Sequence, residues 1–210
     1  MSEHLADVDR AVTGAIVAGG KNERFGGEPK GLFQVGGVRI IDRVASAIRA
    51  VTTEVVLVAN ARDAEQWLAG VPVHRDTRPE RGSVVGVHTA IATARARDVV
   101  LVVAWDMPFV SADLLSLLAT RVRDGAFAAF PEGPSGPEPF CAAYTAACLP
   151  DIERAIARGD FRMASVVAAL PNATRVGLAE VRRFGDPAKL FFNVNTTADL
   201  ETAERMAAEG

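Results

Sequence analysis

The chain has 210 residues, of which 49% are hydrophobic, and a formal net charge of -3 at pH 7. This length favours a single domain, and the apolar content is sufficient for a complete core without disulfides or metals. The acidic balance argues against a nucleic-acid binder, although a local positive site for a small anion is compatible with it.

The lack of long apolar segments and the spacing of the two cysteines both indicate where the protein is located. The N-terminus is polar, and no apolar run approaches the length of about 18 residues that a membrane span needs. Cys141 and Cys148 lack metal-ligand spacing and are expected to be free thiols in a reducing compartment. We therefore expect a cytoplasmic protein with no membrane partner, one domain over residues 1–210, and a flexible tail over residues 1–11.

Short apolar runs recur along the chain and predict strands. They are rich in Val, Ile and Phe and are continuous rather than alternating, which is typical of strands buried on both faces of a parallel sheet. The runs are Thr13–Ala18, Thr53–Ala59, Val71–His74, Asp98–Ala104, Phe127–Pro131, Phe140–Tyr144 and Lys189–Val194.

Helical patterns lie between these runs. Apolar residues repeat at three-to-four spacing over residues 40–48, 84–94 and 114–122, and Ser111 is placed to cap the third helix. Thr196 and Asp199 form a capping box for a last helix that ends near Ala208. The alternation predicts a three-layer α/β/α sandwich with a mostly parallel, Rossmann-like sheet.

A glycine-rich loop, VAGGKNERFGGEPKG, follows the first predicted strand. Gly19 and Gly20 allow backbone N–H groups to point at an anion, and ligands of open α/β sheets bind beyond the carboxyl ends of the strands. Arg24 and Lys30 supply positive charge, so the loop is predicted to wrap phosphates, with a solvated surface loop as the alternative. The loop matches neither the Walker A pattern nor the GxGxxG dinucleotide pattern.

A carboxylate, Asp106, ends the most hydrophobic predicted strand and precedes Met107 and Pro108. At that edge it suits Mg²⁺, which prefers carboxylate and phosphate oxygens. The alternative is that Asp106 caps the next helix, a place that Ser111 already fits.

Two amides, Asn193 and Asn195, stand two residues apart near the C-terminus. On an extended segment they share one face and could hold a polar ligand, or they could simply end a strand. The Pro- and Gly-rich stretch Glu132–Pro139 is interpreted as a turn or flap.

Taken together, these motifs resemble the molybdenum cofactor guanylyltransferases. The family pattern LAGGxSxRMGxDKxL is matched by VAGGKNERFGGEPKGL, CDMPF by WDMPFV, PxPLCALY by PEPFCAAY and NxNTPxDL by NVNTTADL. HRD at His74–Asp76 and RGSVVGV at Arg81–Val87 look like the family's acidic strand end and the turn that follows it. The resemblance spans Thr13 to about Arg205.

The resemblance implies a fold of the nucleotide-diphospho-sugar transferase type and a reaction that joins GMP from GTP to molybdopterin, with Mg²⁺ as cofactor. The implied catalytic residues are Lys30, Asp106 and Arg24, with Asp106 as the metal ligand. Asn193 and Asn195 would face the pterin, and AGG in place of AAG is associated with guanine selection. The implied nucleotide-binding residues are Val17, Ala18, Gly19, Gly20, Lys30, Asn60, Asp76 and Asp106.

Two other functions remain open, and for the first of them the front half of the chain would look nearly the same. One is a nucleotidyltransferase that uses CTP or a sugar, alditol or lactyl phosphate acceptor. The other is a non-catalytic carrier that delivers molybdenum cofactor. Molybdenum cofactor biosynthesis proteins and acceptor oxidoreductases are the expected protein partners, and no nucleic acid is expected.

Overall fold

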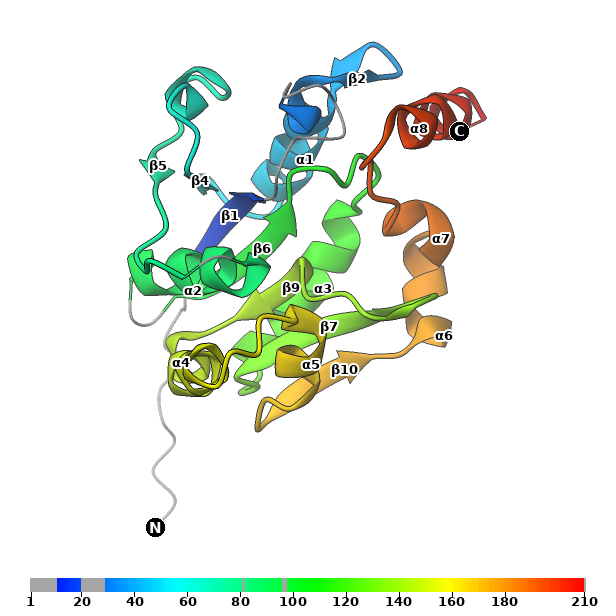
Figure 1. The fold of residues 1–210 in the computed structure, drawn as a ribbon. Helices are drawn as coiled ribbons and strands as arrows, with labels where there is room; N and C mark the ends of the chain where they lie inside the picture. Colours follow the sequence, from blue (N-terminus) through cyan, green and yellow to red (C-terminus); the bar gives the residue numbers. More distant parts are fainter. Residues whose placement is uncertain (1–10, 20–28, 81, 96–97, 210) are drawn as a thin grey trace.

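A computed structural model describes residues 11–19, 29–80, 82–95 and 98–209 of the chain. Within these residues the dominant element is an eight-stranded sheet, with strand order β10-β7-β9-β6-β1-β4-β5 and β8 paired to β7 (Figure 1). The strands are β1 Val12–Ala18, β4 Glu54–Ala59, β5 Val73–His74, β6 Val99–Ala104, β7 Ala128–Gly133, β8 Gly136–Pro137, β9 Cys141–Tyr144 and β10 Ala173–Val176.

The predicted mostly parallel sheet is confirmed. Strand β1 lies between β4 and β6 and is parallel to both, so that Ile16 is in register with Leu57 on one side and Val103 on the other. Strand β5 continues the parallel series beyond β4, and β7 pairs in parallel with β10. Only β9, between β6 and β7, and the short β8 run antiparallel among the described strands of this sheet. The carboxyl ends of β1, β4, β5 and β6 therefore meet at one edge.

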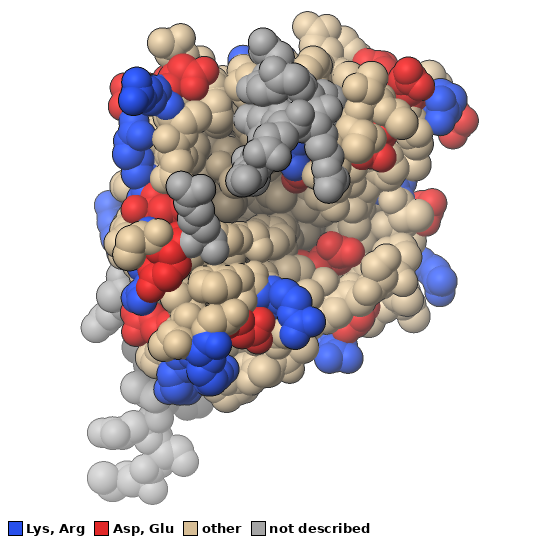
Figure 2. Space-filling view, viewed as in Figure 1, with Lys and Arg blue, Asp and Glu red and all other residues tan. Residues whose placement is uncertain are grey.

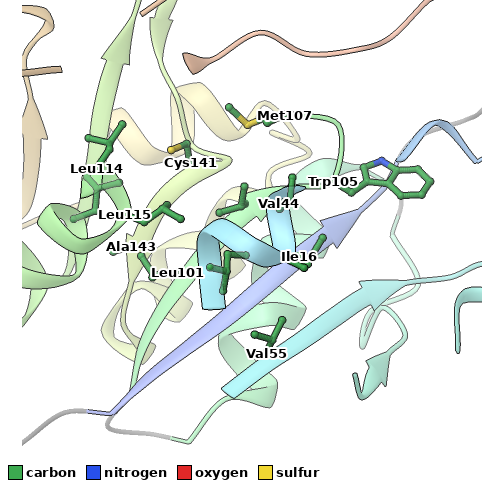
Figure 3. Packing of buried hydrophobic residues seen from close by; sticks show 14 of the residues in the cluster. Ile16, Val44, Val55, Leu101, Trp105, Met107, Leu114, Leu115, Cys141 and Ala143 are labelled. Atoms are coloured by element: carbon green, nitrogen blue, oxygen red, sulfur yellow. The ribbon is translucent and has the colours of Figure 1, made fainter. Parts of the chain in front are cut away.

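Helices cover both faces of this sheet, which confirms the three-layer sandwich (Figure 1). Successive strand residues alternate between the two cores: Ile16 and Leu101 pack into one, and Val17 and Val102 into the other. The first core, shown in Figure 3, is covered by α1 Ile40–Arg49, α3 Ala112–Arg123, α6 Leu178–Val181 and α7 Pro187–Leu190. The second core is covered by α2 Ser83–Thr93, α4 Leu149–Ala157 and α5 Met163–Ala168.

A small third core lies at the end of the sandwich. The two-stranded hairpin of β2 (Gln34–Val35) and β3 (Val38–Arg39) packs there against α8 (Thr197–Ala208). Its buried residues are Val35, Ile40, Val194 and Ala203. Short 3-10 helices connect the larger elements: η2 Lys30–Leu32, η3 Ala64–Gln66, η4 Ala146–Cys148 and η5 Arg182–Phe184.

Local capping signals account for two helix starts. Ser111 Oγ accepts a hydrogen bond from Leu114 N at 3.3 Å at the start of α3. At the start of α8, Thr196 Oγ1 accepts from Asp199 N at 3.2 Å. Asp199 Oδ2 in turn accepts from Asn195 N at 3.0 Å, so two side chains cap the N-terminus of this helix.

The predicted strand over Lys189–Val194 is wrong. Asp186 caps α7 by accepting from Ala188 N at 3.0 Å, and Pro187 favours a helical start, so the first part of this run is helical. Leu190 and Phe191 are buried, but they lie at the end of this helix and not in a strand. The short strand β10 was not predicted, because its sequence ATRV carries too little apolar signal.

Within the described residues no helix has both the length and the apolarity to cross a bilayer. Apart from Ala11, the predicted N-terminal tail lies outside the described residues.

Candidate active site

The carboxyl edge of the parallel strands forms a hollow. Strands β1, β4 and β6 end there at Ala18, Ala59 and Ala104. In the space-filling view this face is hollowed at its centre, with charged side chains gathered mainly around the rim (Figure 2). Gly19 belongs to this edge, whereas the predicted phosphate-loop residues Gly20 and Arg24 lie outside the described residues.

Lys30, Asp106 and Asn195 converge at this edge. The Lys30 ammonium contacts the carboxylate of Asp106 in a direct ion pair. It also donates a hydrogen bond to Asn195 Oδ1 at 2.8 Å, and Asn195 is 165 positions away in the sequence. Three segments that the sequence singled out separately therefore contribute to one polar cluster.

Backbone hydrogen bonds place the members of this cluster. Trp105 N donates to Val17 O at 3.2 Å, which extends the pairing of β6 with β1 up to the residue before Asp106. Val194 N donates to Asp106 O at 2.9 Å and brings the next residue, Asn195, to the same point. Lys30 opens η2, a turn that is closed by a hydrogen bond from Leu32 N to Pro29 O at 2.9 Å.

The Lys30–Asp106 pair is largely withdrawn from solvent: the two side chains are 13% and 10% exposed. Attraction between opposite charges is stronger here than on an open surface, and each group is costly to leave without a partner. An incoming phosphate can take the ammonium as its partner, and the carboxylate is then free to bind a cation.

The alternative role for Asp106, as the cap of the next helix, is excluded. Ser111 provides the side-chain cap of α3, and the carboxylate of Asp106 contacts Lys30 instead.

A second pair of predicted residues, Asn60 and Asp76, forms a clamp across the ends of β4 and β5. Asn60 Nδ2 donates to Asp76 Oδ2 at 2.6 Å, and Asp76 N donates to Asn60 Oδ1 at 2.9 Å. In the sheet order, β4 and β5 lie on the opposite side of β1 from β6, which carries Asp106. Strand β1, which precedes the glycine-rich loop, therefore lies between the Asn60–Asp76 clamp and the Lys30–Asp106 pair. This order is expected if the nucleoside binds near the clamp and the phosphates bind near Lys30.

Three predicted nucleotide-binding residues, Val17, Ala18 and Gly19, close strand β1 between these two groups. Val17 is buried, and α2 approaches it closely, since a Cβ added at Gly86 would lie 2.7 Å from Val17 Cγ1. A Cβ at Gly19 would meet no atom of the described residues within 4 Å.

The expected common face of Asn193 and Asn195 depended on a strand and is not found. Asn195 faces Lys30, but Asn193 Nδ2 donates to Phe191 O at 3.0 Å and takes no part in the described contacts of the Lys30 cluster. The segment after α7 is irregular, so the two-residue alternation of a strand does not apply.

Sequence reasoning missed a half-buried carboxylate, Glu138, beside the β7–β8 hairpin. A Cβ at Gly133 would lie 2.2 Å from Glu138 Oε1, so the carboxylate lies directly over this glycine. Burial, followed by the nearby charge of Glu132, raises the pKa of Glu138 to about 7. The sequence placed Glu138 only in a proline-rich turn and gave no sign of its burial.

Comparisons with known proteins agree with this geometry. The model of the MobA-like NTP transferase domain matches residues 14–174. The chain belongs to the MobA-like NTP transferase family. Within this family of nucleotidyltransferases, Lys30 and Asp106 lie inside the matched residues, whereas Asn195 lies beyond them.

Relatives of the chain cover nearly its whole length. A molybdenum cofactor guanylyltransferase of Desulfosudis oleivorans is 35% identical over 95% of this chain and 98% of its own. A probable molybdenum cofactor guanylyltransferase of Pelotomaculum thermopropionicum is 32% identical over 93% of each chain. The crystal structure of molybdopterin-guanine dinucleotide biosynthesis protein A from Archaeoglobus fulgidus is 26% identical, with a TM-score of 0.78 over 94% of this chain and 100% of that chain.

Proposed function

We propose that this nucleotidyltransferase transfers the GMP group of GTP to the terminal phosphate of molybdenum-loaded molybdopterin and releases pyrophosphate. The observation that carries the proposal is the convergence of Lys30, Asp106 and Asn195 at the edge where β1 delivers the glycine loop. The names of the full-length relatives supply the guanine donor and the molybdenum cofactor acceptor.

The reaction is an in-line displacement at the α-phosphorus of GTP. An oxygen of the acceptor phosphate forms the new bond to the α-phosphorus, and the bond from that phosphorus to the oxygen bridging to the β-phosphorus breaks. The electron pair leaves with pyrophosphate. The attacking oxygen already carries negative charge, so no nucleophilic side chain is needed, and catalysis consists of positioning and charge stabilisation.

Within this scheme Lys30 offsets the negative charge that builds on the departing pyrophosphate. Arg24 is proposed for the same task, although it lies outside the described residues. Asn195 Oδ1 accepts a hydrogen bond from the ammonium and helps to hold it in place. Preorganised charge of this kind commonly contributes about 10²-fold or more per donor.

The residues present fit a divalent cation that enters together with the nucleotide. The described residues hold no cluster of three metal-ligating side chains, but Mg²⁺ typically needs only one or two carboxylates when phosphates supply further oxygens. We propose Asp106 as that carboxylate. The bound cation would neutralise charge on the phosphates.

We propose the remaining assignments as the resemblance to the family implies them. The Asn60–Asp76 clamp is proposed to contact the nucleoside, together with Val17, Ala18, Gly19 and Gly20 of the first strand and its loop. Asn195 is proposed to face the acceptor, and Asn193, whose amide bonds Phe191 O, is proposed to contribute less to acceptor binding. The proposed location is the cytoplasm, where cofactor biosynthesis proteins and acceptor oxidoreductases would meet the product.

The decisive experiment measures pyrophosphate release by the purified chain with molybdopterin and Mg²⁺, comparing GTP with CTP. We expect release with GTP, dependence on the acceptor, and a dinucleotide product identified by mass. Faster release with CTP would reassign the donor. Absence of release with either nucleotide, despite binding of the cofactor, would support the carrier function instead.

A further inference from the structure

Trp105 stands directly before Asp106 and is almost completely buried. Its indole ring stacks on that of Trp67, with ring centroids 4.9 Å apart and an angle of 20° between the planes. Trp67 is itself held by a hydrogen bond from its Nε1 to Asp63 Oδ2 at 3.1 Å. In Figure 3 the Trp105 ring lies at the tip of β1, at the border of the first core. The ring is therefore fixed both by stacking and by packing.

The backbone of Gly31, the residue after Lys30, rests against this ring. A Cβ added at Gly31 would lie 2.4 Å from Trp105 Cε3 and 2.9 Å from Cδ2, well inside van der Waals contact. The φ angle of Gly31 is not in the left-handed region, so glycine is required here by the close approach and not by the backbone conformation. A side chain at this position would lift the turn off the indole.

We propose that Trp105 is a positioning residue for Lys30. Its backbone, bonded to Val17 O, sets the place of Asp106, while its ring sets the height of the turn that carries Lys30. One residue thus fixes both ends of the Lys30–Asp106 pair and allows the ammonium to reach Asn195 as well. The catalytic consequence of this role rests on the proposed function, but the positioning itself does not.

The stacking surface of the indole, and not its polar atom, carries this role. Trp105 Nε1 is buried and has no hydrogen-bond partner among the described residues, and leaving a buried donor unpaired is energetically costly. A smaller apolar ring at this position avoids that cost but leaves a gap beneath Gly31. We therefore expect Trp105→Phe to retain part of the positioning and Trp105→Leu to lose most of it.

The first test uses two single substitutions, at Gly31 and Trp105, and the double variant that combines them. Gly31→Ala should lower kcat by about 10²-fold, the scale expected when a catalytic group is displaced by about 1 Å, with a smaller change in the KM for GTP. Trp105→Leu should lower kcat in the same way. The double variant Gly31→Ala, Trp105→Leu should be more active than Gly31→Ala alone, because the smaller side chain makes room for the methyl group.

A matched control is available at Gly177, which has an ordinary φ of -70° and, within the part of the chain that the structure describes, no heavy atom within 4 Å of its added Cβ. Gly177→Ala should leave kcat unchanged. If Trp105→Leu does not fold, Gly31→Ala and Trp105→Phe still test the proposal.

The second test does not depend on turnover. The amides of Leu32 and Phe33 close the η2 turn by donating to Pro29 O at 2.9 Å and Lys30 O at 3.3 Å. Hydrogen exchange at these two amides should accelerate in Gly31→Ala and Trp105→Leu. The increase should exceed what the change in the free energy of global unfolding, measured in urea, would produce, because the turn opens locally. Faster exchange in a chain without GTP turnover would support the positioning and refute the proposed function. Unchanged exchange and unchanged kcat in a chain that turns over GTP would refute the positioning alone.

Discussion

The ammonium of Lys30 lies against the carboxylate of Asp106, 76 positions later in the sequence, and the two side chains neutralise each other at the carboxyl edge of the sheet. Neither group is exposed enough to be satisfied by water alone. A ligand that draws Lys30 to its phosphates must supply a new partner for Asp106, and a divalent cation carried by those phosphates meets this need.

Removal of either charge should slow transfer strongly without unfolding the chain. Lys30→Met and Asp106→Asn are each expected to lower kcat/KM for GTP by about 10²-fold or more, because charge on the leaving pyrophosphate is then unbalanced. Steady-state pyrophosphate release measures this. Lys189→Met is the control, because the Lys189 ammonium donates to Met206 O at 2.6 Å and does not contact Asp106 or Asn195 in the described contacts. This variant should retain activity. Normal turnover by Lys30→Met would remove Lys30 from the mechanism.

Binding of a cation without nucleotide should be opposed by Lys30. With the ammonium in contact with Asp106, Mn²⁺ alone is repelled, and Lys30→Met should bind Mn²⁺ more tightly in the absence of GTP than the unmodified chain does. Electron paramagnetic resonance of free Mn²⁺ measures the bound fraction. Asp106→Asn should bind little in either case. Equal affinity for Mn²⁺ in Lys30→Met and in the unmodified chain would show that the ion pair with Lys30 does not hinder cation binding to Asp106.

The two C-terminal amides should differ in their effects. Asn195→Ala removes the acceptor of the 2.8 Å hydrogen bond from Lys30 and is expected to lower kcat by about tenfold. Asn193→Ala removes the bond to Phe191 O and should affect kcat less. Rates at saturating GTP and acceptor separate the two variants. A larger loss of kcat in Asn193→Ala would contradict this order.

The Asn60–Asp76 clamp depends on a buried anchor in α2. The residue after Asp76, Thr77, donates its N–H to Thr89 Oγ1 at 3.1 Å, and His88, next to Thr89, contacts Glu153 at 3.2 Å. Thr89→Val keeps the shape but leaves the Thr77 N–H without this acceptor. It should raise the KM for GTP severalfold, about 1 kcal/mol in binding, with little change in kcat.

Thr93→Val is the matched control for that change. Among the described residues, the Thr93 hydroxyl bonds only to carbonyls of its own helix, Thr89 O at 2.8 Å and Ala90 O at 3.4 Å. Its KM for GTP should stay at the unmodified value, and Thr89→Ser should restore most of the affinity. Equal KM values for Thr89→Val and Thr93→Val would mean that the anchor does not reach the nucleotide.

The free energy of unfolding should depend on pH through Glu138. Its pKa is raised from 4.5 to about 7 by burial and by Glu132, which in turn pairs with Arg175 at 2.9 Å. The folded state therefore holds a proton that the unfolded state has lost, and stability falls as pH rises from about 4.5 to about 7. Glu138→Gln should remove this fall and stabilise the chain at about pH 8 by about 1 to 2 kcal/mol, after allowance for solvent screening.

Urea unfolding at about pH 5 and about pH 8 provides the comparison. The stability difference between Glu138→Gln and the unmodified chain should be larger at the higher pH. A difference that is the same at both pH values would show that Glu138 ionises as it does in the unfolded chain.

Local sequence determined much of the fold. The continuous apolar runs from Thr13 to Ala104 became parallel strands because they can be buried on both faces, and Ser111 and Thr196 begin helices because their hydroxyls accept backbone N–H groups nearby. The pattern failed at Lys189–Val194, where Asp186 and Pro187 start a helical turn and apolarity alone cannot distinguish a buried helix end from a strand.

The sequence by itself also determined which residue types stand at strand ends and loops, and so named Lys30, Asp106, Asn60, Asp76 and Asn195 as candidates. Only the tertiary structure decided that Lys30 meets both Asp106 and Asn195, that Asn60 holds Asp76, and that Asn193 faces elsewhere. It also placed Trp105 beneath Gly31. The physical reason is that contacts between residues tens to hundreds of positions apart are set by strand order and packing, and neither is encoded in the spacing of any one motif.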